Sequence, residues 1–479
     1  MIKEKYKRWG FKSNPFIIEP LEPSAQSSEL LVGRGKLKEE IIQLIQSNTG
    51  IVTIEGVNGI GKTSLLNVIS YYMHVYSLNH STDVLYVPCI EVFELRDKFS
   101  VDEISNEIYF ALAQTLIDKA AELKTKKGSI PDTKYLDVWL NSTELQSIQG
   151  TIAGFGAGQS RTLNTADGFS SSGFRLKVKK LLKEIFPTNE DGGIICIVDN
   201  MELVKTSEAA MDTMNWLRDN AVNIKGTKWI FSGSNGVISA GRRNTRLSSF
   251  LHEPVQVRPV KSTFVTSFLN QRIQTFKKAD DPYLPFNVHH FKLLYNELNG
   301  NLRDTLQKIG SYCSWIDKKN KDPYFPNEKT ELFQKWLEII KKKTYTEIKN
   351  SLSNGALLIL KNIIKNKGKF NQDELSKQGI KNINELEDFI LELDSNGLIS
   401  LDIFAREQFK KAYGTYLTDA SGKIDLVNQQ EVSNKKVKGD IEDISDFYEL
   451  EYLENDEVLE DLQIITISPR GSIIANMLD

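Results

Sequence analysis

Short runs of β-branched and aromatic residues alternate with amphipathic segments along the first half of the chain. Residues 51–54 (IVTI), 194–198 (IICIV) and 229–231 (WIF) are continuous apolar runs, which are typical of strands buried on both faces of a sheet. Between them, apolar residues recur at helical spacing, as they do over residues 65–69. Because strands that alternate with helices form parallel sheets, this pattern predicts an α/β core.

The loop after the first strand, residues 56–64 (GVNGIGKTS), fits the phosphate-binding pattern G-x-x-x-x-G-K-[ST]. Its glycines let backbone N–H groups turn toward phosphate oxygens, and the next helix adds the partial positive charge of its N-terminus. We expect Lys62 to reach the β and γ phosphates and Thr63 to coordinate Mg²⁺. The motif therefore predicts ATP and Mg²⁺ as cofactors. The loop residues expected to bind the nucleotide are Gly56, Asn58, Gly59, Ile60, Gly61, Lys62, Thr63 and Ser64.

A second apolar strand, residues 194–198, ends in Asp199-Asn200-Met201-Glu202. Mg²⁺ needs a carboxylate beside the phosphate loop, so Asp199 is the expected metal-side residue of this Walker B strand. Asn200 stands at the next position, where ATPases that hydrolyse quickly commonly carry a water-activating Glu, and we therefore expect a slow ATPase. Glu202 is a candidate for polarising the water, and an ordinary surface carboxylate is the equal alternative.

Composition and charge narrow the class of protein. The 479 residues are enough for about two to four domains, and 40% hydrophobic with 26% charged residues is ordinary for a soluble protein. No uncharged run is long enough to span a bilayer and no signal peptide is visible, so we expect a cytoplasmic protein. The three cysteines lie far apart, which favours buried thiols. A net charge of −3 gives no overall reason to expect nucleic acid.

The order of these motifs resembles that of the AAA+ ATPases. The similarity is greatest to the branch of the origin-recognition initiators and the related signal-transduction ATPases, which end in a winged helix, and it covers residues 10 to about 310. Residues 10–16 (GFKSNPF) resemble the N-terminal segment that flanks adenine in that branch. Val32, Gly33 and Arg34 resemble its adjoining adenine-flanking box.

The resemblance also implies roles for residues beyond the phosphate loop. Ser234 or Asn235, at the end of a third strand, matches the sensor 1 position, and Arg303 in Gly-Asn-Leu-Arg matches the sensor 2 arginine that approaches the γ-phosphate. Arg246 lies near the place where this branch carries an arginine finger, which completes the site of a neighbouring subunit. Arg242 and Arg243 are alternatives for that role. The catalytic residues expected in all are Lys62, Asp199, Glu202, Arg246 and Arg303.

The predicted fold is an AAA+ core with a parallel sheet, a helical lid and a C-terminal winged helix-turn-helix domain. The core occupies residues 1–255 and contains a Gly/Ser-rich insertion at about 128–172, which is either a contact element or a plain loop. The lid and linker occupy 256–350, and the winged helix occupies 351–479 with an acidic insertion at about 430–461. Within that insertion, residues 440–461 hold eleven carboxylates and no basic residue.

The motifs and the resemblance together predict an ATP-binding ATPase that acts as a nucleotide-controlled oligomerisation switch. A homo-oligomer and a separate effector protein are the expected partners, and the resemblance suggests defence against mobile elements as a setting. The alternative is a DNA-binding initiator or transposition regulator that loads on duplex DNA. Clusters of lysine, such as Lys341 to Lys343, favour DNA binding, whereas acidic residues on the third winged-helix segment, including Asp388 and Glu392, oppose it. A regulator that only binds ATP is the third possibility.

Overall fold

The contacts of the computed structural model divide the chain into two units. One consists of Met1–Lys292 with Gly300–Asp322, and the other of Leu293–Asn299 with Pro323–Asp479. Residues 300–322 of the predicted lid therefore belong to the same unit as the phosphate loop. The structure describes residues 4–47, 50–94, 101–128, 130, 132–141, 171–201, 214–234, 237–242, 245–365, 383–401 and 465–474.

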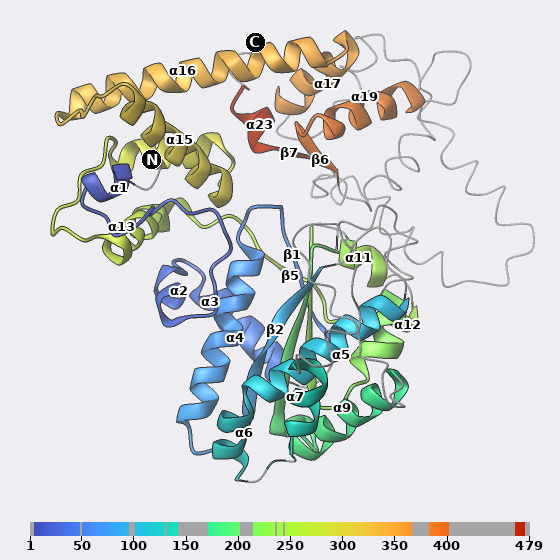
Figure 1. Ribbon diagram of the computed structural model, residues 1–479. Coiled ribbons are helices and arrows are strands. Elements are labelled where there is room, and N and C mark those ends of the chain that lie inside the picture. The colour runs from blue at the N-terminus through green and yellow to red at the C-terminus, as the bar shows by residue number, and fades with distance from the viewer. Residues whose placement is uncertain are drawn as a thin grey trace, which may run out of the picture. The chain divides into compact units, whose positions relative to one another are not determined.

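The first unit is built on a five-stranded sheet with the strand order β2-β3-β4-β1-β5, in which every pairing is parallel (Figure 1). Each residue of β1 and of β3 is buried, as the continuous apolar runs predict. The predicted α/β fold with a parallel sheet is therefore confirmed. The strands are β1 (Val52–Glu55), β2 (Leu85–Glu94), β3 (Gly192–Asp199), β4 (Thr227–Gly233) and β5 (Val255–Gln256).

Helices cover both faces of this sheet because the chain reverses its direction of travel across it. The connection from β1 to β2 steps one way across the sheet, and the connections from β2 to β3 and from β3 to β4 step back. Since parallel crossovers are right-handed, the two directions put their helices on opposite faces. Figure 1 shows α3 (Gly35–Gln46) and α4 (Lys62–Asn79) on one side, and α5 (Val101–Asp118) and α9 (Ser171–Ile185) on the other.

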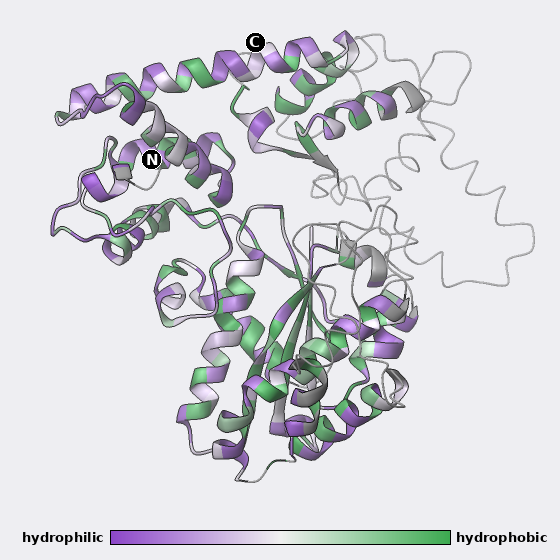
Figure 2. Cartoon of the chain, viewed as in Figure 1, coloured by the Kyte–Doolittle hydropathy of each residue, from purple (hydrophilic) through white to green (hydrophobic). Residues whose placement is uncertain are grey.

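The apolar residues of these elements form one core around the central strands. Ile54 of β1, Ile195 of β3 and Leu66 of α4 belong to the same buried cluster. Figure 2 shows the hydrophobic strands enclosed by helices whose outer sides are hydrophilic. Burial at about 25 cal/mol per Å² of apolar surface favours this arrangement, and it fixes the carboxyl ends of the strands at one edge of the sheet.

One predicted helix is interrupted. The segment from Val101 to Leu123 is expected to be a single helix, but α5 ends at Asp118 and α6 begins at Ala120. Lys119 between them has φ −99° and ψ 8°, outside helical values, and both helices have good helix-forming residues at the break. Within the predicted insertion the structure describes α7 (Lys134–Asn141), while residues 142–170 lie outside the described part.

The first unit also contains two helices of the predicted lid and several short elements. Helices α13 (Val265–Phe276) and α15 (Leu302–Lys318) belong to the predicted lid. The N-terminal segment contacts α15 through Lys5, which donates to the Ser314 hydroxyl, and the ring of Trp9 meets Tyr283, which follows α13, edge-on. The remaining short elements are α1 (Glu4–Arg8), α2 (Ala25–Leu30), η1 (Asn189–Asp191), η3 (Arg218–Val222), α11 (Val237–Arg242), α12 (Thr245–Ser248) and η4 (Ser262–Phe264).

The described part of the second unit is mainly helical. A two-stranded antiparallel sheet pairs β6 with β7, and Glu392 of α19 accepts hydrogen bonds from the backbone N and the hydroxyl of Ser353 at the start of α17. Glu392 is expected to be one of several exposed acidic residues, but it holds Ser353, whose hydroxyl accepts from the backbone N of Ala356 and caps α17. The elements are α14 (Val288–Glu297, whose first residues belong to the first unit), α16 (Pro326–Ser351), α17 (Asn354–Lys365), α19 (Ile383–Ser395), β6 (Ile399–Leu401), β7 (Ile465–Ile467) and α23 (Pro469–Ser472).

The winged helix stays a prediction. The sequence predicts three helices there, over residues 357–364, from Phe370 and over residues 383–393, with strands at Ile399 and at residues 464–467. Helices α17 and α19 lie at the first and third of these positions, and β6 and β7 lie at those of the strands. The middle helix, expected to begin at Phe370, lies outside the described residues, as does the acidic insertion at 430–461. Among the helices that the structure describes, none is both long enough and apolar enough to span a bilayer.

Candidate nucleotide-binding site

The phosphate loop joins the end of β1 to the start of α4. Gly61, the residue before the helix, has φ 98°, a conformation that favours glycine. Lys62 is 6% exposed, and its ammonium donates to the carbonyl of Gly56 at 2.8 Å, with Asn58 Oδ1 at 3.4 Å. The loop therefore encloses the cation that is expected to meet the β and γ phosphates.

Asp199 lies at the end of β3, beside the first turn of α4. Its Oδ2 accepts a hydrogen bond from the Thr63 hydroxyl, whereas its buried Oδ1 has no hydrogen-bond partner among the described residues. The whole side chain is 2% exposed. A buried carboxylate oxygen without a partner is costly, so this position suits a cation that supplies the missing contact. The two oxygen donors, Thr63 and Asp199, fit Mg²⁺, which prefers hard oxygen ligands.

The lid is attached to the phosphate loop through the first turn of α15. Asn301 is 6% exposed; its Oδ1 accepts from the backbone N of Asp304 and caps the helix, and its Nδ2 donates to the carbonyl of Asn58 at 2.7 Å. The backbone N of Arg303 donates to the carbonyl of Gly59 at 3.2 Å. Gly59 has φ 80°, and a Cβ there would lie 2.5 Å from Asn301 Oδ1, so the close approach of lid and loop requires glycine.

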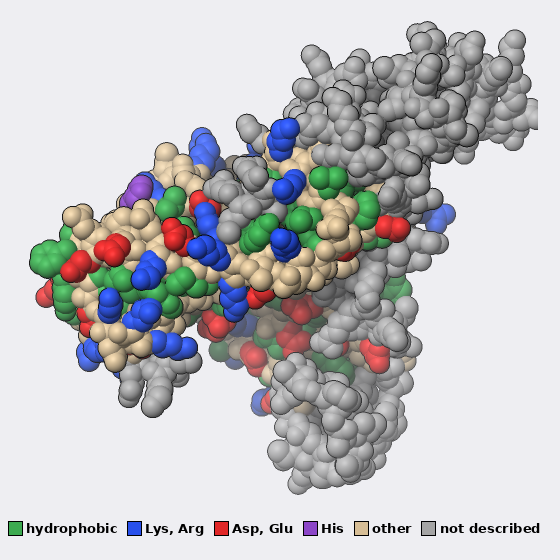
Figure 3. Space-filling model, turned by 90° about the horizontal axis from the view of Figure 1, so that it is seen from above, with side chains coloured by type: hydrophobic (Ala, Val, Ile, Leu, Met, Phe, Trp, Pro, Cys, Tyr) green, Lys and Arg blue, Asp and Glu red, His purple; other side chains and the backbone are tan. Residues whose placement is uncertain are grey.

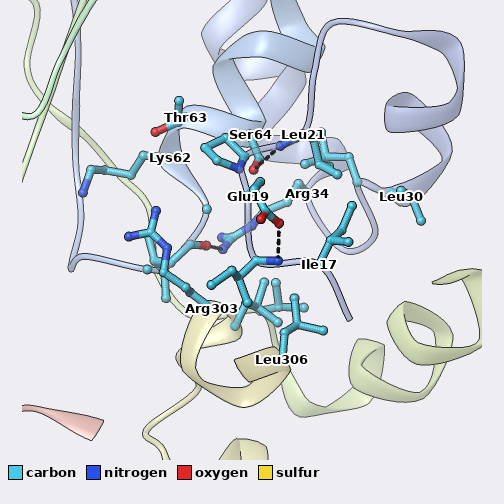
Figure 4. Close-up of a pocket in the computed structure, with 18 of the residues that line it drawn as sticks. Ile17, Glu19, Leu21, Leu30, Arg34, Lys62, Thr63, Ser64, Arg303 and Leu306 are labelled. Atoms are coloured by element: carbon cyan, nitrogen blue, oxygen red, sulfur yellow. Dashed lines mark hydrogen bonds between the residues drawn. The ribbon is translucent and has the colours of Figure 1, made fainter. Parts of the chain in front are cut away.

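These elements enclose a cavity of about 310 Å³, which is within the range of small-molecule sites. Figure 4 shows Lys62, Thr63 and Arg303 at one side of it, and the apolar side chains of Ile17, Leu30 and Leu306 at the other. One end is therefore cationic and suits phosphates, and the other is apolar and suits the flat face of a base. Further lining residues are Ile18, Glu19, Pro20, Leu21, Leu31, Val32, Arg34, Asn58, Gly59, Ile60, Gly61, Ser64, Asn200, Val260, Phe268, Arg272 and Leu302.

The N-terminal segment forms part of the apolar wall and is tied to both sides of the cavity. Arg272 of α13 is 5% exposed and donates to the carbonyls of Pro15 and Ile17, and burial lowers its pKa to about 10. At the other end of the segment, the backbone N of Leu21 donates to the Ser64 hydroxyl at 3.0 Å. The segment therefore links the lid helix to the phosphate-loop helix.

The adenine-flanking box that the resemblance implies lies at the same cavity. Val32 and Arg34 line it, and Gly33, with φ 77°, packs against Val260 and Phe264. Arg34 is 8% exposed, and its guanidinium donates to the carbonyls of Ile60 and Arg258. Its contacts support the phosphate loop from behind, which is a structural role that the resemblance does not specify.

Two buried residues of this region were missed by the sequence analysis. Glu55, the last residue of β1, is 2% exposed and accepts hydrogen bonds from Ile238 N, from Ser239 N and Oγ, and from Gln256 Nε2. It anchors the start of α11, the helix that precedes the arginine-rich loop. Asn301 has a detectable signal, because an Asn directly before an amphipathic run is a typical helix N-cap. Glu55 has only the signal of a charge at the end of an apolar run.

The remaining predicted residues fall in different places. Arg303 is exposed and lines the cavity. Arg246 is exposed on α12, and its charge contributes to lowering the pKa of Asp219, after the larger effect of the Arg218 hydrogen bond. Arg242 is half-buried on α11. Glu202, Asn235 and Arg243 lie outside the described residues. The roles given to all these residues stay predictions.

No family model and no curated protein matches the sequence. Among solved structures, the chain is similar to the ORC2 protein of Aeropyrum pernix in its ADPNP–ADP complexes, with 13% identity, 82% of this chain and 92% of that chain covered, and a TM-score of 0.45. The Walker-type ATPase of Pyrococcus abyssi is 14% identical, with 81% and 94% covered and a TM-score of 0.45. Cdc6p from Pyrobaculum aerophilum is 12% identical, with 93% of each chain covered and a TM-score of 0.33.

These solved structures are ORC, Cdc6 and Walker-type ATPase proteins. At 12 to 14% identity and TM-scores of 0.33 to 0.45, their similarity carries no argument about this chain. What this chain binds has to follow from its own side chains. Lys62, Thr63 and Arg303 line one cavity, and Asp199 accepts a hydrogen bond from Thr63.

Proposed function

We propose that this protein is an ATP-binding AAA+ ATPase in which the nucleotide controls assembly into an oligomer. One observation carries the proposal: the phosphate loop and the first turn of the lid helix α15 are hydrogen-bonded around a single cavity that is cationic at one end and apolar at the other. A ligand that fills this cavity contacts both elements at once. Its binding energy therefore stabilises their joined arrangement.

The phosphates of ATP fit the cationic end. Lys62 and Arg303 supply charge-assisted donors from the loop and from the lid, and the N-terminus of α4 adds its partial charge. Thr63 and Asp199 are the residues that would hold Mg²⁺, which neutralises phosphate charge when it is bound. The base fits between Ile17, Leu30 and other apolar residues of the opposite end.

The lid makes the site responsive to the γ-phosphate. Arg303 follows Asn301 by two residues on α15, so the same turn that is bonded to the loop carries the exposed guanidinium. A triphosphate reaches both Lys62 and Arg303, whereas a diphosphate offers one anionic group fewer. ATP therefore makes more contacts than ADP with the lid and the loop together, and this difference in binding energy favours the arrangement in which the lid is joined to the loop.

In the assembly, an arginine of one subunit is proposed to bind the phosphates in the site of its neighbour. Arg246 is exposed on a short helix after β4, and α11 before it is anchored by the Glu55 carboxylate directly next to the phosphate loop. An arginine suits this role because its guanidinium is permanently charged and binds phosphate oxygens in a bidentate manner. Arg242 and Arg243 are the next candidates.

The experiment is sedimentation by analytical ultracentrifugation with and without a non-hydrolysable ATP analogue. The wild-type chain is expected to assemble only with the analogue, and Arg246→Ala is expected to bind the analogue normally without assembling. Arg8→Ala is the matched control, because Arg8 is also an exposed arginine but pairs with Asp317. Nucleotide-independent sedimentation of the wild-type chain contradicts the switch. Normal assembly of single Ala variants at positions 242, 243 and 246 and of the triple variant contradicts the arginine mechanism.

Nucleic acid is the alternative partner. Lysine clusters favour it, but on α16 the Lys341 ammonium lies 2.9 Å from the Glu297 carboxylate, and both side chains are mostly buried. Figure 3 shows basic and acidic side chains intermixed over the face that α16 presents in that view, rather than a patch of one sign. A separate effector and a role in defence against mobile elements are proposed from the resemblance alone.

A further inference from the structure

The position after Asp199 holds an amide where a water-activating carboxylate is expected. Asn200 lines the nucleotide cavity and has φ 56°, so the chain turns sharply at the end of β3. Its Nδ2 donates to Glu94 Oε1 at 3.1 Å. An amide has no basic group that could take a proton from water, but the carboxylate that it holds does.

Glu94 is the last residue of β2, the strand next to β3. In the parallel register its Cα partner is Asp199. Partners in neighbouring strands lie about 4.8 Å apart and send their side chains to the same face of the sheet. Glu94 therefore leaves the sheet beside the carboxylate that bonds to Thr63, on the same face and at the same edge.

An irregularity in β2 produces this alignment. Pro88 pairs with Ile195, so an uninterrupted register would put Val92 opposite Asp199; the register instead shifts between Pro88 and Val92, and Glu94 takes that place. Irregularities of this kind occur often next to active sites, where they redirect a side chain. Without the shift, an apolar side chain would stand next to the metal-side carboxylate.

Two other carboxylates of the described region, Glu55 and Glu19, lie near the cavity and accept hydrogen bonds from other groups. Both oxygens of Glu55 accept hydrogen bonds from neighbouring groups within the fold. Glu19 lines the cavity and accepts from the backbone N of Ile18 at 3.0 Å, and Figure 4 shows it near the middle of the cavity. Glu94 differs from Glu55 because its side chain is exposed to water. It differs from Glu19 because the sheet register places it beside Asp199 and it accepts from Asn200.

We propose that Glu94 is the water-activating carboxylate of this ATPase and that Asn200 is its positioning residue. The inference rests on the proposed ATPase function. The oxygen of a water molecule forms a bond to the γ-phosphorus, and the bond from that phosphorus to the bridging oxygen breaks, leaving its electron pair on ADP. A proton of the water passes to Glu94, which returns it to solvent after phosphate leaves. In this proposal the carboxylate stands at the end of β2, and the position after Asp199 carries only the amide that holds it.

The test is steady-state phosphate release together with titration of a fluorescent ATP analogue. Glu94→Gln is expected to lower kcat about 100-fold while the affinity for Mg-ATP stays within about twofold. Glu91→Gln is the matched control, since Glu91 is an exposed carboxylate of the same strand, and it is expected to behave as wild type.

The exchanged pair gives the sharpest result. A double variant with Glu94→Gln and Asn200→Glu moves the carboxylate to the neighbouring strand and keeps the amide partner, so it is expected to recover kcat to within about tenfold of the wild type. Wild-type turnover by Glu94→Gln overturns the proposal, and loss of turnover in Glu202→Gln alone assigns the base to Glu202. A wild-type chain that binds Mg-ATP and assembles without hydrolysing it overturns this inference and leaves the switch intact.

Discussion

The ends of β3 and β1 each carry a buried carboxylate, and the two carboxylates are used in opposite ways. At the end of β3, one oxygen of Asp199 accepts from Thr63 and the other has no partner in the described part of the chain. At the end of β1, the oxygens of Glu55 accept from Ile238, Ser239 and Gln256 at 2.8 to 3.0 Å. A buried carboxylate with an oxygen that accepts no hydrogen bond suits a ligand. A buried carboxylate whose oxygens both accept hydrogen bonds stabilises the fold.

The contrast explains how the site combines rigidity with the ability to bind. Glu55 lies directly before the phosphate loop and fixes the starting point of the loop to α11. Asp199 makes a single contact with the phosphate-loop helix and keeps an oxygen for a cation. Changes on the Asp199 side should therefore alter nucleotide binding, and changes at Glu55 should alter stability.

The largest effect is expected from Lys62→Ala, on the ligand side of this comparison. The substitution removes a charged donor to the phosphates from a side chain that is 6% exposed, so the affinity for Mg-ATP should fall by about 3 kcal/mol, or roughly 100-fold. Titration of a fluorescent ATP analogue measures it. Lys36→Ala, an exposed lysine on α3, is the control and should bind as wild type. Unchanged affinity in folded Lys62→Ala would remove the phosphate-loop assignment.

A smaller effect is expected from Glu55→Gln, on the structural side. Gln keeps the size of Glu, but its amide nitrogen cannot accept hydrogen bonds. The groups that donate to that oxygen of Glu55 therefore lose their acceptor. The free energy of unfolding without nucleotide should therefore fall by about 2 kcal/mol, as measured by urea denaturation.

Asp199→Asn is the matched control for Glu55→Gln. It removes a buried charge that has one open oxygen, so the unfolding free energy should change by less than about 0.5 kcal/mol while the Mg²⁺-dependent part of ATP binding is lost. Equal destabilisation by the two substitutions would show that the carboxylates do not differ in role.

The same contrast separates what the sequence could predict from what it could not. The phosphate loop and Asp199 are recognisable because each is a contiguous motif whose residues act near their own strand. The strands themselves follow from apolar runs, and the parallel arrangement follows from their alternation with helices. The break at Lys119 was not predictable, since Ala120 and its neighbours have good helix propensity.

Residues that depend on distant partners could not be assigned. Glu55 meets Ile238, which is 183 residues away, and Arg272 meets Pro15 across 257 residues. Glu94 meets Asn200 across 106 residues, and only the irregular register of β2 brings them together. Strand order and register decide these contacts, and neither can be read from local periodicity.

The smallest effect is expected at Asn301, where one side chain combines both roles of the comparison. Its Oδ1 caps α15, a structural contact, and its Nδ2 donates to the Asn58 carbonyl of the phosphate loop, a contact that presets the site for a ligand. Asn301→Ser separates them, because Ser is a good N-cap but too short to reach the loop. Its unfolding free energy should stay close to that of the wild type, and its affinity for Mg-ATP should fall by about 1 kcal/mol.

Asn301→Ala completes the test, because it removes the helix cap as well as the contact with the loop. It should lose about 1 kcal/mol of unfolding free energy in addition to the affinity that Asn301→Ser loses. Urea denaturation and titration of the fluorescent analogue on both variants give the four values needed. If Asn301→Ser binds as tightly as the wild type while Asn301→Ala is destabilised, Asn301 is a helix cap only. The lid would then be connected to the loop through the backbone of Arg303 alone among the hydrogen bonds described.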